Sequence, residues 1–134
     1  MDFKIYSEQG YGIVFSSREF DGAGMVSHYS VDLAAPTMSG AARVYNGPYG
    51  VSPDDLFQSI YREWRGWKGE KSWGSLEGEF DLVAVSDSTG HIAMTARIHT
   101  GYGSPSSNMQ IEFIIESGQA ERLAKQAKAF FNAD

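Results

Sequence analysis

Segments in which apolar and polar residues alternate fill the first third of the chain. Phe3 and Ile5 are separated by one polar residue, and Tyr29, Val31 and Leu33 recur at every second position. Alternation of this kind places the apolar side chains of a β-strand on one face. The pattern predicts an antiparallel meander, followed by a loop over 46–50, with strands over 3–7, 11–20, 26–35 and 37–46.

The next segment has the pattern of a helix. Ser52 is a suitable N-cap, Pro53 suits the first helical position, and Asp54 and Asp55 favour the positive end of the helix dipole. Gly66 is expected to be the residue that ends the helix. The apolar residues between these ends recur at helical spacing and form one stripe, which comprises Leu56, Phe57, Ile60, Tyr61 and Trp64.

Strands resume after this helix, and a second helix ends the chain. Alternation predicts strands over 79–86, 91–99 and 109–116, and Ser117 can cap the final helix. The order strands, helix, strands, helix predicts the α+β class, with two helices packed on an antiparallel β-sheet. A length of 134 residues fits a single domain over 1–134.

The composition narrows the class of protein. A hydrophobic content of 42% with 21% charged residues is ordinary for a globular domain. The longest apolar run is Leu82 to Val85, against the roughly 18 to 20 residues of a membrane span, and the N-terminus has no secretory pattern. We therefore expect a cytoplasmic protein that binds no membrane. The net charge of −6 opposes binding to nucleic acid, because the long-range field repels phosphates.

Candidate catalytic and metal-binding groups are few. The absence of cysteine excludes disulfides, thiol catalysis and cysteine-ligated metals. His91 and His99 share a predicted strand face but lie roughly 26 Å apart at strand rise, and no metal-ligand spacing is present. The sequence contains no G-x-S-x-G motif, which would position a nucleophilic serine. These observations predict a non-enzymatic protein without a metal or a cofactor.

Three carboxylates alternate near the middle of the chain. In a strand, Glu77, Glu79 and Asp81 would line one face at a spacing of about 7 Å. Paired carboxylates can carry out acid–base chemistry on glycosidic bonds. The favoured interpretation is a solvated strand face, and such a face could also steer a charged partner.

The segment from Arg62 to Glu79 has the most unusual composition of the chain. It contains all three tryptophans, and four of the eleven basic residues lie within 62–71. Trp and Arg are typical of protein interfaces, and aromatic and basic residues together also suit single-stranded nucleic acid. The favoured alternative is a corner of the core, in which Trp67 folds back on the helix and one tryptophan is left for a partner. The binding candidates are Trp64, Arg65, Trp67, Lys68 and Trp73.

The same segment resembles a family of small bacterial proteins of unknown function. The similarity is carried by the motif G-W-x-G-x-x-x-W-x-S-L-E over 66–77 and by the strand–turn–strand that follows it to His91. More loosely, the order of elements is similar to that of WapI-type immunity proteins, which neutralise the toxin domains of bacterial competition systems. The first resemblance implies no activity for any residue. The second implies a protein partner, namely a toxin domain.

Two functions are favoured, and a third, an unrecognised hydrolase, would require a buried Ser, His and carboxylate that hydrogen-bond one another. The first is a protein-binding domain of the immunity type, which covers the surface of a toxin with exposed aromatic and acidic residues. The second is a small-ligand-binding module with an aromatic pocket between the sheet and the helices. A homodimer formed through a sheet edge is compatible with either function.

Overall fold

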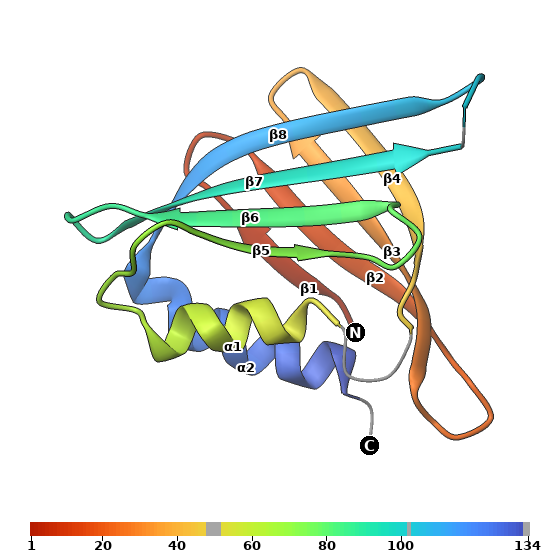
Figure 1. Cartoon of the computed structure of the whole chain (residues 1–134), viewed down its shortest axis with the longest axis horizontal. Helices are drawn as coiled ribbons and strands as arrows, with labels where there is room; N and C mark the ends of the chain where they lie inside the picture. Colours follow the sequence, from red (N-terminus) through yellow and green to blue (C-terminus); the bar gives the residue numbers. More distant parts are fainter. Residues whose placement is uncertain (48–51, 102, 133–134) are drawn as a thin grey trace.

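The computed structural model describes residues 1–47, 52–101 and 103–132, which form two antiparallel sheets of four strands each and two α-helices (Figure 1). The first sheet has the order β1 (Phe3–Tyr6), β2 (Gly12–Phe20), β3 (Val26–Ala35) and β4 (Met38–Tyr45). The second has the order β5 (Glu70–Gly74), β6 (Phe80–Ser86), β7 (His91–Thr100) and β8 (Ser107–Glu116). Helix α1 (Asp54–Arg62) follows the first sheet, and a 3-10 turn (Ser117–Gln119) and helix α2 (Ala120–Phe131) follow the second.

The predicted class and order of elements are confirmed. Each half of the chain is a four-stranded meander followed by a helix. The difference from the expectation is that the strands divide into two sheets, which cross each other in Figure 1. Alternation in a sequence shows which face of a strand is buried, but it does not show which strands share a sheet.

The core lies between the two sheets and is closed at one end by the helices. The helices lie side by side, with α2 in contact with β1 and α1 in contact with β5 (Figure 1). The ring of Phe131 packs 5.2 Å from Tyr29 and 5.3 Å from Phe15, measured between ring centroids. Phe80 of the second sheet lies 5.7 Å from Phe15 of the first. Aromatic side chains from both sheets and both helices therefore contact one another in this space.

Helix α1 begins at Asp54 with Pro53 at the N-cap position, one residue later than predicted. The side-chain oxygen of Ser52 accepts a hydrogen bond from the backbone N–H of Asp54 at 3.3 Å. The predicted end is wrong, because α1 ends at Arg62 instead of continuing to the residue before Gly66. Gly66 has a φ of +127°, and its N–H donates to the carbonyl oxygen of Glu63 in a turn. This earlier end removes Trp64 from the helix.

Two other predictions are corrected by the structure. The segment between the first helix and the strand at 79–86, for which no strand was predicted, contains an additional strand, β5. Ser117 does not cap the last helix, because it begins a 3-10 turn and its N–H donates to the carbonyl oxygen of Gly90 at 2.8 Å. Residues 48–50 of the predicted loop lie outside the described residues.

Candidate functional site

Trp64 is the exposed member of the tryptophan cluster. It lies just after the end of α1, and its relative exposure is 47%. The guanidinium carbon of Arg65 lies 5.2 Å from the centroid of the indole, and Arg65 is itself exposed. A guanidinium over an indole face is a favourable cation–π arrangement, worth about 0.5 to 1 kcal/mol at an exposed site. The pair therefore forms an ordered aromatic and basic feature on the surface.

Trp67 and Trp73 have a different role, because both pack against the core. The Trp73 ring lies 5.7 Å from that of Phe80, and both indole Nε1 atoms are buried without a hydrogen-bond partner among the described residues. The ammonium of Lys71 lies 5.1 Å from the Trp67 ring and donates to Ser59 Oγ at 2.7 Å. The same ammonium also pairs with the carboxylate of Glu63, so that β5 is attached to α1. Lys68 is exposed on the turn between these two tryptophans.

The three carboxylates do not line one strand face. Strand β6 begins at Phe80, so that Glu77 lies in the turn before it, where its side chain is exposed. Asp81 is paired across the strands with Arg97, whose Nη2 and Nε lie 2.8 and 3.0 Å from one carboxylate oxygen. Glu79 is partly buried and is bound by two other segments: its Oε2 accepts from the Tyr45 N–H of β4 at 2.9 Å, and its Oε1 accepts from Ser75 Oγ in the turn before β6 at 2.7 Å. Both oxygens of Glu79 are thus engaged within the fold.

A shallow groove of about 260 Å³ adjoins Trp64 at the end of the helix pair. Tyr61, which is 38% exposed, lines it with Trp64 and with Ser117, Gly118, Ala120 and Glu121. The Tyr61 hydroxyl donates to Glu121 Oε2 at 3.3 Å, and Glu121 Oε1 pairs with Lys125 at 3.0 Å. The hydrogen bond and charge of Lys125 lower the pKa of Glu121. We call Tyr61, Trp64, Arg65 and Glu121 the Trp64 corner.

Sequence reasoning missed two members of this corner. Tyr61 was assigned to the buried stripe of the helix, because its spacing fits that stripe. Glu121 lies 60 residues from Tyr61 along the chain, and no local pattern connects them. Only the packing of α1 against α2 brings the two residues together.

The histidines are distributed over separate positions. His28 lies 3.5 Å from Glu19 on the first sheet, whereas His91 lies between Asp87 and Glu116 on the second. Within residues 1–47, 52–101 and 103–132, no three His, Asp or Glu side chains are grouped to hold a metal ion. Neither described helix is both long enough and apolar enough to cross a membrane.

The chain was compared with curated proteins, solved structures and protein families. No curated protein and no solved structure matches the chain. A family model described as a family of unknown function, DUF6228, matches residues 5–134, which covers both helices and both sheets except the first two residues of β1. The chain therefore belongs to the DUF6228 family.

Proposed function

We propose that this protein is a non-enzymatic protein-binding domain of the immunity type, which blocks a toxin domain by covering its surface. The observation that carries the proposal is the Trp64 corner, where two aromatic side chains and an arginine are exposed beside a groove. Trp, Tyr and Arg are the residues most enriched among those that dominate binding energy at protein interfaces.

The shape of the groove supports a macromolecular partner. A volume of about 260 Å³ is below the roughly 300 to 1,000 Å³ of typical small-ligand pockets. The aromatic side chains between the sheets pack against each other as a core, and the alternative function as a small-ligand module gains no support from this packing. A partner side chain or loop is a suitable occupant for the groove.

The charge of the chain supports a basic partner. The net charge of −6 raises the rate of encounter with a basic protein and lowers it with an acidic one. Arg65 in the corner then provides a directional contact on a chain of net negative charge. A basic toxin domain has this complementary charge.

The test has two stages, which separate binding from protection. The intact chain is first used to capture partners from cells of the organism that encodes it. A captured partner is then expressed in a host with and without the chain. The proposal predicts that the partner alone arrests growth and that the intact chain restores it, while Trp64→Ala with Arg65→Ala does not. A partner that leaves growth unchanged would contradict the immunity function, while its capture would still support protein binding.

A further inference from the structure

The outer edge of β8 is open to a further strand. Each edge strand makes a tertiary contact: β1 contacts α2, β5 contacts α1, the Tyr45 N–H of β4 donates to Glu79, and β8 contacts β3 of the first sheet. The outer edge of β8 is paired with no strand of the described part of the chain. Its ten residues include neither proline nor lysine, which commonly protect sheet edges from pairing. The strand is therefore a template for the addition of an extended segment.

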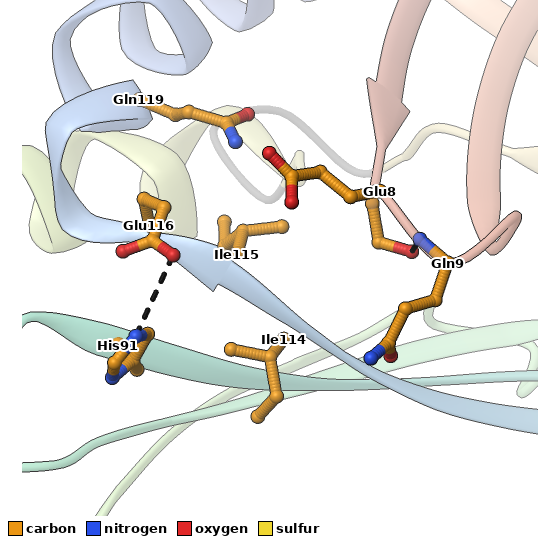
Figure 2. A pocket seen from close by; sticks show the side chains of 8 residues that line it. Glu8, Gln9, His91, Ile114, Ile115, Glu116 and Gln119 are labelled. Atoms are coloured by element: carbon orange, nitrogen blue, oxygen red, sulfur yellow. Dashed lines mark hydrogen bonds and ion pairs between the residues drawn. The ribbon is translucent and has the colours of Figure 1, made fainter.

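A cavity of about 300 Å³ lies beside the end of this edge (Figure 2). Glu8 and Gln9, on the turn between β1 and β2, lie across it from Ile114 and Ile115 of β8, and Glu116 lies beyond Ile115, where it is joined to His91 (Figure 2). This volume is at the lower limit for a small-ligand pocket, and it suits a single side chain of a partner.

The charges in the cavity favour a cation. Glu8 and Glu116 both line it, and no lysine or arginine does. Glu116 Oε1 lies 3.5 Å from His91 Nε2, whereas Glu8 forms no ion pair with another described residue. Carboxylates that line a cavity attract an ammonium or a guanidinium group.

The outer face of β8 indicates the sequence pattern of the added strand. Glu112, Ile114 and Glu116 alternate on this exposed face, and Ile114 is 47% exposed. Ile114 is in register with Ala93, which is in register with Val85, so that an apolar row spans three of the four strands and ends at the open edge. Side chains directly opposite each other on neighbouring strands interact most strongly.

We propose that β8 binds an extended segment of a basic partner with the pattern basic–x–apolar–x–basic. The apolar residue continues the row from Ile114. The two basic residues lie opposite Glu112 and Glu116, and the basic residue opposite Glu116 reaches into the cavity toward Glu8. This inference rests on the proposed function, because it specifies the chemistry of the partner. A second copy of the chain is the other occupant that the test distinguishes, and its antiparallel registers centred on Glu112 or on Ile114 place glutamates opposite one another.

The test uses defined peptides and needs no natural partner. The probe is the end-blocked nonapeptide Thr-Thr-Lys-Thr-Val-Thr-Lys-Thr-Thr, and its control has Glu in place of both Lys. Each is titrated to about 1 mM, a concentration that detects binding of about −4 kcal/mol. Backbone amide signals of the full chain are followed by NMR. We expect saturable shifts over 107–116 with the lysine peptide only, and slower amide exchange along β8.

Two double variants with the same net charge distinguish the effect of the cavity carboxylates on affinity from the effect of the overall charge. Glu8→Gln with Glu116→Gln is expected to weaken the lysine peptide about three- to tenfold, because two exposed charge pairs are lost. Asp2→Asn with Asp32→Asn removes the same charge from exposed positions near the N-terminus and on the first sheet, and is expected to leave affinity unchanged.

Several outcomes would overturn the inference. These are equal binding of the glutamate peptide, saturable shifts elsewhere, no saturable shift at all, or equal weakening by the two double variants. If the amide signals over 107–116 shift with protein concentration in the absence of peptide, a second copy of the chain binds the edge. The Trp64→Ala, Arg65→Ala protein should bind the peptide like the intact chain, so that failure here and failure of the proposed function remain distinguishable.

Discussion

The carboxylate of Glu79 accepts a hydrogen bond from the backbone N–H of Tyr45 at 2.9 Å and thereby joins the second sheet to the edge of the first. The other carboxylate oxygen accepts from Ser75 Oγ, which also receives the Phe80 N–H at 3.1 Å. The carboxylate thus holds the turn before β6 and the end of β4 together.

Replacement of Glu79 should destabilise the fold. Hydrogen bonds to a charged group contribute about 1.5 to 3 kcal/mol, so that Glu79→Ala should lower the free energy of unfolding by an amount in that range. Glu70→Ala, at the exposed start of β5, should change it by less than about 0.5 kcal/mol. Urea unfolding of both variants measures the difference, and equal stabilities would contradict the role given to Glu79.

The tryptophans should separate into structural and surface residues. Trp73→Ala removes a ring that packs on Phe80 and should cost about 2 to 4 kcal/mol, somewhat below the loss for a fully buried ring. Trp64→Ala should cost less than about 1 kcal/mol, because about half of its side chain is in solvent. Denaturant unfolding of the two variants provides the test. A larger loss for Trp64 would assign this residue to the core.

Tyr29 should make the stability of the fold sensitive to alkaline pH. Burial, and secondarily the charge of Glu79, raise the pKa of its phenol well above the ordinary value. The unfolded chain loses this proton above about pH 10, while the folded chain keeps it, so that stability is retained below that pH and falls as pH rises further. The slope from this one group is about 1.4 kcal/mol per pH unit.

Tyr29→Phe isolates that contribution from the other titrating groups. The hydroxyl is buried and has no hydrogen-bond partner among the described residues, so that its removal should have a small effect near pH 7. Above about pH 10 the variant should lose stability less steeply than the intact chain. Parallel curves of unfolding free energy against pH would show that the phenol ionises equally in both states.

The strands that could be predicted are those with one face in the core. Alternation identified seven of the eight strands, because their inward residues are apolar. Strand β5 was missed, since one of its inward residues is Lys71, whose ammonium is accommodated by groups of α1. A polar inward residue removes the period-two pattern, and only the tertiary contact explains its position.

The site was predictable only in part, for a similar reason. The tryptophan-rich segment indicated where to look, but burial of Trp67 and Trp73 and exposure of Trp64 depend on the early end of α1. Glu79 has the local sequence of a solvent-facing residue, and its partner Tyr45 lies 34 residues away. Such long-range pairs leave no local pattern in a single sequence.

The central claim is that the Trp64 corner is the binding surface. The most direct measurement is the dissociation constant of a captured partner for the intact chain, for Trp64→Ala with Arg65→Ala, and for Met38→Ala, a matched exposed apolar residue on β4. Loss of an interface hot spot should weaken the corner variant by about 30-fold or more, with Met38→Ala unchanged. Equal affinities for all three proteins, with all three equally stable, would contradict the claim.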